Sequence, residues 1–175
     1  ALTEEGRWMP SQDWRFDAVP AGARAIFTCV PTVNKAVVAA TVGATEAAEA
    51  VGQELAALLA GYGSINRAAR AAQVPTIGVA HGTVNGCVTE HGVPMAGFDH
   101  EFTTTILFSA GVQAFMLGHI HKHQSWEDSG RVIAYAGSIG RFHHGELDAK
   151  GFLQWEVGAA AARFRLVETP ARRTM

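Results

Sequence analysis

Two stretches of sequence decide the fold of this 175-residue chain: Thr76-Ile-Gly-Val-Ala-His81 and Ala114-Phe-Met-Leu-Gly-His-Ile-His121. Each begins as a short apolar run, which is typical of a buried strand, and each ends in histidine. In open α/β sheets, ligands gather at the carboxyl ends of the strands. The two stretches therefore predict neighbouring strands that bring their histidines together at one end of a sheet.

Patterns on either side of these stretches predict the remaining elements. Further strands are expected over residues 25–30, 132–135, 151–157 and 162–167, and residues 36–41 form either a strand or a loop. Helices are expected over residues 45–60, 64–73 and 103–110, with Gly61 ending the first of them. Glycine and proline punctuate residues 1–24 and 82–100, which are expected to be irregular.

This order of elements predicts the fold class and the number of domains. Helix–strand alternation gives way to a run of strands in the last third of the chain. The fold class is therefore α/β, with a central sheet that is covered by helices and extended by antiparallel strands. No internal repeat or linker-like segment interrupts residues 1–175, so we expect a single domain.

Composition narrows the classes of function. The chain has 14 Lys+Arg against 16 Asp+Glu, a net charge of −2, which gives no support to nucleic-acid binding by charge alone. No apolar run approaches the roughly 18 residues of a membrane span, and the first residues do not form a secretion signal. Cys29 and Cys87 are the only cysteines, too few for a disulfide scaffold, which predicts a reducing, cytoplasmic compartment.

The histidines that end the two deciding stretches are candidates for metal ligands. Neutral imidazole is a common ligand of transition metals. Gly118 lets the backbone turn sharply before His119, and the apolar strand before it holds that turn rigidly. A metal role is therefore predicted for His81, His119 and His121, although a single strand-end histidine is more often a polar cap.

The same residues carry a resemblance to a known family. Gly118-His-Ile-His121 resembles the last motif of the calcineurin-like metallophosphoesterases, and Val79-Ala-His-Gly82 resembles their preceding single-histidine motif. The stretch that follows resembles the SbcD-type DNA exonucleases of that family in Ala134-Tyr-Ala-Gly-Ser138, Gly140-Arg-Phe142, Glu146 and Lys150-Gly-Phe152. The resemblance runs from Ile26 to Val167 and implies a sandwich of β-sheets flanked by helices, of which this chain supplies one sheet and its helices.

The resemblance also implies a metal centre and partners. The counterparts of His81 and His119 bind one metal ion, and the counterpart of His121 binds a second. Two divalent ions, Mn²⁺ first and Zn²⁺ or Fe as alternatives, activate a water and stabilise the phosphate in transit. DNA and an SbcC-like ATPase are the implied partners. Arg141 and His143 are candidates for binding a phosphate of the substrate, although a surface turn also explains His143.

Three motifs of the family are missing from this chain: Asp-x-His, Gly-Asp-x-x-Asp and Gly-Asn-His-Asp. Asp13 and Asp17 lack the surroundings of such motifs, and Asp99-His100 lacks the preceding Gly-Asn. In the family these motifs supply the bridging carboxylate and the histidine that assists the leaving group, so no catalytic residue is assigned here. We therefore expect the chain to be the carboxy-terminal half of the catalytic domain and to be inactive by itself.

Two alternatives stay open at this point. A metallophosphoesterase acting on small phosphoesters or cyclic nucleotides would share the histidines, but the stretch from Tyr135 to Phe152 argues against it. A scaffold that kept the fold and lost the chemistry would lack the same carboxylates, but it would have no chemical need for all three histidines. Of the others, His91 and His100 are expected to be solvated or to contact substrate, and His123 to form a local hydrogen bond.

Overall fold

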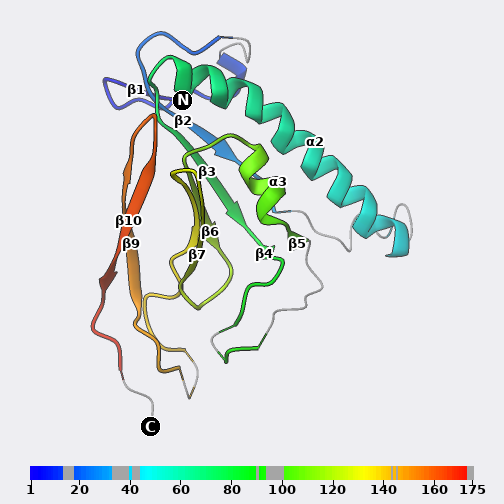
Figure 1. Cartoon of the computed structure of the whole chain (residues 1–175), viewed down its shortest axis with the longest axis vertical. Coiled ribbons are helices and arrows are strands. Elements are labelled where there is room, and N and C mark those ends of the chain that lie inside the picture. Colours follow the sequence, from blue (N-terminus) through cyan, green and yellow to red (C-terminus); the bar gives the residue numbers. More distant parts are fainter. Residues whose placement is uncertain are drawn as a thin grey trace.

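A central six-stranded sheet organises the protein. The computed structural model describes residues 1–13, 18–32, 40, 44–89, 91–93, 101–142, 144 and 146–172. The strand order is β1-β2-β3-β6-β8-β7, in which β2, β3, β6 and β8 run parallel and β1 and β7 are antiparallel edges. The strands are β1 Leu2–Thr3, β2 Ala23–Cys29, β3 Thr76–His81, β6 Ala114–Gly118, β7 Gln124–Asp128 and β8 Arg131–Tyr135. The fold is therefore α/β, as predicted, with a mainly parallel sheet (Figure 1).

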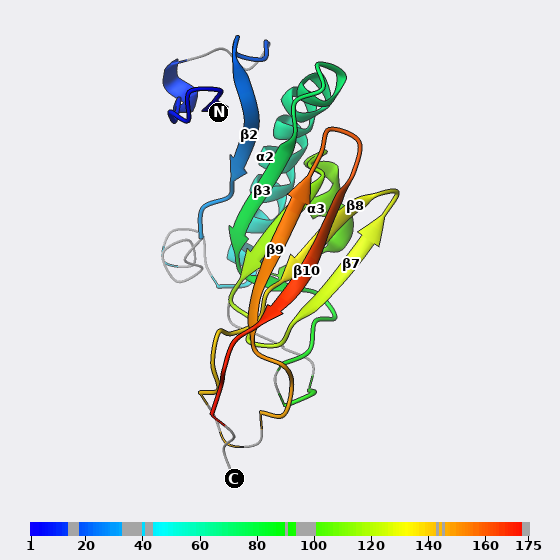
Figure 2. The same cartoon turned by 90° about the vertical axis from the view of Figure 1, so that its left-hand side faces the viewer.

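Two helices cover one face of this sheet. They are α2 Ala44–Ala71 and α3 Thr104–Ser109, and both lie on the same side of the strands in Figure 2. Val51, Leu55 and Leu59 form a buried stripe along α2 that packs into the main hydrophobic core. Thr103 caps α3, because its side-chain oxygen accepts a hydrogen bond from the backbone nitrogen of Ile106 at 3.1 Å.

The expected break between two helices at Gly61 is wrong, because a single helix runs from Ala44 to Ala71. Gly63 explains why glycine is accommodated in this region. A Cβ atom built on Gly63 would lie 2.6 Å from the carbonyl oxygen of Ser109, which is closer than real Cβ atoms approach. Gly63 therefore allows close packing against the end of α3, whereas a Cβ atom on Gly61 would meet nothing within 4 Å.

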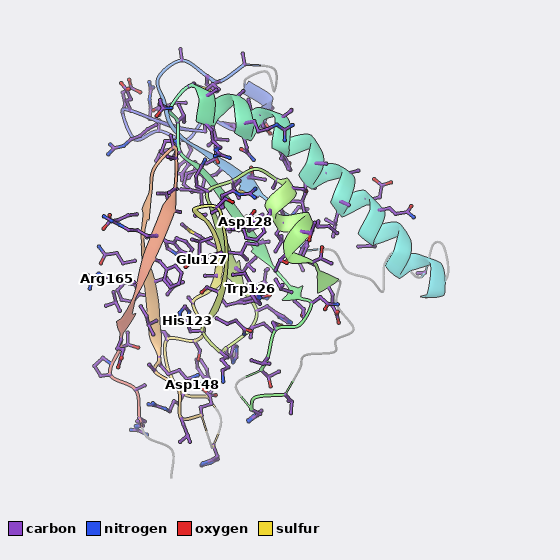
Figure 3. All side chains as sticks on the ribbon, viewed as in Figure 1. His123, Trp126, Glu127, Asp128, Asp148 and Arg165 are labelled. Atoms are coloured by element: carbon purple, nitrogen blue, oxygen red, sulfur yellow. The ribbon has the colours of Figure 1, made fainter. Side chains whose placement is uncertain are left out.

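The last two strands do not extend the central sheet as predicted. β9 Gly151–Val157 and β10 Ala162–Glu168 pair only with each other in an antiparallel hairpin. Figure 2 shows this hairpin in front of the sheet, on the face opposite the helices. The ring of Phe164 contacts the ring of His123 with centroids 5.4 Å apart, while Arg165 points outward from the hairpin (Figure 3). The inner face of the hairpin is apolar, so it covers the sheet instead of joining its edge.

Gln113 ties the hairpin to the start of the parallel strands. Its Oε1 accepts a hydrogen bond from the backbone nitrogen of Thr76 at 2.8 Å, and its Nε2 donates to the carbonyl oxygen of Ala159 at 2.8 Å. The side chain is fully buried, so both polar atoms are satisfied inside the protein. This clamp lies at the amino ends of β3 and β6, the end of the strands opposite the histidines.

The irregular segments hold a few short elements. They are η1 Ser11–Asp13 and the parallel pair β4 Thr83–Val84 and β5 Glu101–Phe102. The possible strand over 36–41 falls outside the described residues apart from residue 40. Within the described residues, no helix combines the length and the apolar composition needed to cross a lipid bilayer.

Candidate metal centre

His81 and His119 lie together at the carboxyl ends of neighbouring strands. β3 and β6 are parallel, and His81 stands opposite Gly118 in their register. The ring centroids of His81 and His119 are 5.2 Å apart, with an angle of 66° between the ring planes. This confirms the expectation that these two imidazoles converge at one end of the sheet.

The backbone around Gly118 is shaped to bring the two rings together. A Cβ atom on Gly118 would lie 2.9 Å from Nδ1 of His81, so only glycine leaves room for that ring. The next residue, His119, has a φ of 109°, a conformation that residues with a side chain rarely adopt. Such strain persists only where the surrounding structure enforces it, and it is frequent at functional sites.

The spacing of the pair fits two ligands of one metal ion. Two imidazoles that bind a tetrahedral ion at about 2.1 Å place their ring centres roughly 5 Å apart, because each centre lies about 1 Å beyond the bound nitrogen. The observed 5.2 Å agrees with this value. It also falls in the range of an edge-to-face ring contact, so the pair can exist with or without an ion.

His121 does not complete a cluster of three imidazoles. Its ring lies beside the ring of Phe142 instead, with centroids 5.7 Å apart. Among the described residues, no three histidine, cysteine, aspartate or glutamate side chains come close enough to share a metal ion. The structure therefore assembles His81 and His119, while a ligand role for His121 stays a prediction.

Residues from the stretch after the motif hold the histidine-bearing loops in place. Tyr135 is fully buried, and its hydroxyl donates a hydrogen bond to the carbonyl oxygen of Gly82 at 2.5 Å, next to His81. Burial raises the pKa of the Tyr135 phenol well above its ordinary value, so the hydroxyl stays a donor. Gly137, with a φ of 83°, packs so closely that a Cβ atom there would lie 3.1 Å from the carbonyl oxygen of His121.

Two further polar groups contact the carbonyl oxygen of His121. Nζ of Lys150 donates to the oxygen of His121 at 3.2 Å, and Oγ of Ser138 lies 3.4 Å from it. Glu146 in turn forms an ion pair with Lys150. In the sequence, Ser138, Glu146 and Lys150 stand out only because their motifs resemble those of the family. Their residue types alone predict no role for them.

Arg141, a candidate for binding phosphate, is engaged in hydrogen bonds to the backbone. The guanidinium of Arg141 donates hydrogen bonds to four backbone carbonyls, those of Glu146, Asp148, Ala171 and Arg172, at 2.8 to 3.2 Å. These bonds tie the loop after Ser138 to the end of the chain, so contact of Arg141 with substrate stays a prediction.

The other sequence candidates are placed as follows. His123 forms the local hydrogen bond that was expected, from Nδ1 to the carbonyl oxygen of Tyr135 at 2.7 Å. His91 is exposed, as expected for a solvated residue. Outside the described residues lie Asp17, Asp99, His100 and His143.

The site can therefore offer two strand-end imidazoles to a cation. A third histidine, His121, lies in a loop whose backbone is held by Lys150 and Ser138. The chain matches no protein-family model and no curated protein.

Proposed function

We propose that this chain is the carboxy-terminal part of a dinuclear metal-dependent phosphodiesterase that resembles the SbcD-type DNA exonucleases. One observation carries the proposal: the separate segments that bear the resemblance meet at one place. The strand ends with His81 and His119 lie side by side, and Tyr135, Gly137 and Lys150 contact the backbone of the two histidine loops.

Contact between these segments is a separate observation from their likeness in sequence. A resemblance of short motifs concerns only their order along the chain. The hydrogen bond from Tyr135 to Gly82 joins residues 53 positions apart, and that from Lys150 to His121 joins residues 29 positions apart. Buried polar side chains that support a candidate ligand loop are what a rigid metal centre requires.

Each histidine has a distinct part in this proposal. His81 and His119 hold one divalent ion through neutral imidazole nitrogens, and His121 contributes to a second. When bound, the ions supply positive charge that stabilises the phosphate in transit, with Mn²⁺ the first expectation and Zn²⁺ or Fe the alternatives. The bridging carboxylate and the remaining ligands would come from an amino-terminal part of the same domain.

An apolar side chain on the central sheet is open to a covering segment, as the proposal expects. Val79 lies on the interior strand β3, between Ile77 and His81 on the same face, and is 39% exposed. Its neighbour in register, Cys29 on β2, is exposed as well. A covering segment would remove this apolar surface from water. The proposal further assigns the protein to the cytoplasm, with DNA and an SbcC-like ATPase as partners.

A paired activity assay on the longer protein tests the proposal. Linear double-stranded DNA and bis(p-nitrophenyl) phosphate are supplied with Mn²⁺, with and without a chelator, to the wild type and to His119→Ala. We expect chelator-sensitive cleavage of DNA that the variant loses. Cleavage of small phosphoesters alone would instead favour the alternative substrate class, and no cleavage of either would favour a scaffold that has lost its chemistry.

A further inference from the structure

The lysine that contacts the backbone of His121 belongs to a buried ion pair whose carboxylate has been given no role so far. The pair joins Nζ of Lys150 to Oε2 of Glu146 at 2.5 Å, and their side chains are 1% and 0% exposed. We infer that Lys150 and Glu146 are positioning residues for His121, which fix both its backbone and its ring. This inference rests on the proposed role of His121 as a metal ligand.

The burial of the pair calls for an explanation other than stability. Removing two charges from water is costly, and their mutual attraction has to offset that cost. Apolar residues of similar volume commonly serve the fold as well or better. A buried pair therefore points to a specific task for its polar atoms, and the hydrogen bonds of the pair show which atoms these are.

The ammonium of Lys150 donates one hydrogen bond to the backbone of His121. Nζ donates to the His121 carbonyl oxygen at 3.2 Å while it contacts Glu146. Ser138 approaches the same oxygen with Oγ at 3.4 Å. A charged donor makes a stronger hydrogen bond than a neutral one, so the carbonyl of His121 is held mainly by Lys150.

The carboxylate of Glu146 also acts on the His121 side chain, through Phe142. Its Oε1 accepts a hydrogen bond from the backbone nitrogen of Phe142 at 3.2 Å. The ring of Phe142 lies 5.7 Å from the ring of His121. One carboxylate thus orients the ammonium that holds the His121 backbone and also holds the residue against which the His121 imidazole packs.

A pair of matched lysine variants tests this inference on the longer protein, in which the remaining ligands of the second ion are expected. Lys150→Met removes the donor to His121. Lys122→Met is the control, because it removes an equal charge from the residue next to His121. The ammonium of Lys122 forms an ion pair with Asp148 at 3.3 Å, and Asp148 lies near the His123 end of β7 in Figure 3. We expect Zn²⁺ affinity, measured by calorimetry, to fall about tenfold or more in Lys150→Met and to stay unchanged in Lys122→Met.

A second variant keeps the test usable if Lys150→Met alone fails to fold. The double change Glu146→Gln and Lys150→Met removes both charges and keeps the volume, so the fold should persist. Its Zn²⁺ affinity should fall as in the single variant, because the carbonyl of His121 has still lost its charged donor. An affinity equal to that of the wild type in this folded variant would overturn the inference.

A thermodynamic cycle with His121→Ala separates positioning from general stabilisation. If the pair acts through His121, the double change should have no further effect on Zn²⁺ affinity once His121 is alanine. An equal loss in both backgrounds, or no loss from His121→Ala itself, would overturn the inference while the pair of His81 and His119 stands. Absence of Zn²⁺ binding that depends on His119 would overturn the proposed function and this inference with it.

Discussion

The imidazole of His81 occupies the space that a side chain at position 118 would need. A Cβ atom on Gly118 would lie 2.9 Å from Nδ1 of His81. His81 is exposed, so its ring can turn toward solvent when it is pushed. Crowding at position 118 would therefore act on the candidate centre more than on the stability of the fold.

Gly118→Ala is expected to weaken Zn²⁺ binding at least tenfold and to change the free energy of unfolding by less than about 1 kcal/mol. The methyl group displaces the His81 ring from its place beside His119. Gly140→Ala is the control, since a Cβ atom there meets nothing within 4 Å. Calorimetry and urea unfolding on both variants measure the two quantities, and equal Zn²⁺ affinity in the two would contradict the prediction.

His119→Gly is expected to be more stable than His119→Ala by about 1 kcal/mol, because glycine alone adopts a φ of 109° without strain. The matched control is Glu54, which is exposed on α2. There the glycine variant should be less stable than the alanine variant by about 1 kcal/mol. Urea unfolding of the four variants gives the comparison, and the same sign at both positions would rule out backbone strain at residue 119.

The chain is expected to bind Zn²⁺ or Ni²⁺ detectably and Mn²⁺ poorly. Imidazole nitrogens favour the first two ions, whereas Mn²⁺ stands lower in the affinity order and prefers oxygen ligands. His119→Ala should remove most of the affinity, and the exposed His91→Ala should leave it unchanged. Calorimetric titrations of the three proteins measure this. Wild-type affinity in His119→Ala would mean that the strand-end pair does not act as a ligand.

Tyr135→Phe is expected to lower stability by about 1 to 2 kcal/mol at pH 7, because the carbonyl of Gly82 loses its donor in a buried site. Burial raises the pKa of Tyr135 in the folded state. An unfolded chain releases this proton above about pH 10, so the wild type loses stability there by about 1.4 kcal/mol per pH unit. The variant lacks this loss, and urea unfolding at pH 7 and pH 11 should show the difference shrinking with pH.

The 175-residue chain alone should hydrolyse neither linear DNA nor bis(p-nitrophenyl) phosphate at a useful rate. Two-metal catalysis needs ions held about 3.5–4 Å apart, and the described residues offer no carboxylate that joins the histidine pair. Initial rates with Mn²⁺ and with Zn²⁺ measure this. Robust metal-dependent cleavage that is lost in His119→Ala would show that the chain carries a complete centre.

Most of the longer strands could be predicted from the sequence because local pattern and burial agree there. The expected strands 76–81 and 151–157 coincide with β3 and β9. β2, β6, β8 and β10 differ from expectation by no more than two residues at either end. Convergence of His81 with His119 followed from the strand ends, because parallel neighbours finish at the same edge.

Other features depend on tertiary contacts that no local pattern contains. β7 has the sequence Gln-Ser-Trp-Glu-Asp and lacks the apolar run of a buried strand, since it is an edge strand. The signal that could have found it is Ser129-Gly130, a two-residue turn in which both φ angles are positive. The place of the β9–β10 hairpin could not be predicted from the sequence either. Pairing with the edge of the sheet and packing on its face require the same alternation of apolar and polar side chains.

The left-handed backbone at His119 also bears on how this sequence can drift. A lineage freed from metal chemistry would gain stability by exchanging His119 for glycine, so neutral mutation would tend to erase the histidine. The same relaxation would admit a larger residue at position 118 once His81 no longer had to face its partner. Relatives that use this metal chemistry are therefore expected to carry both His119 and a glycine at position 118.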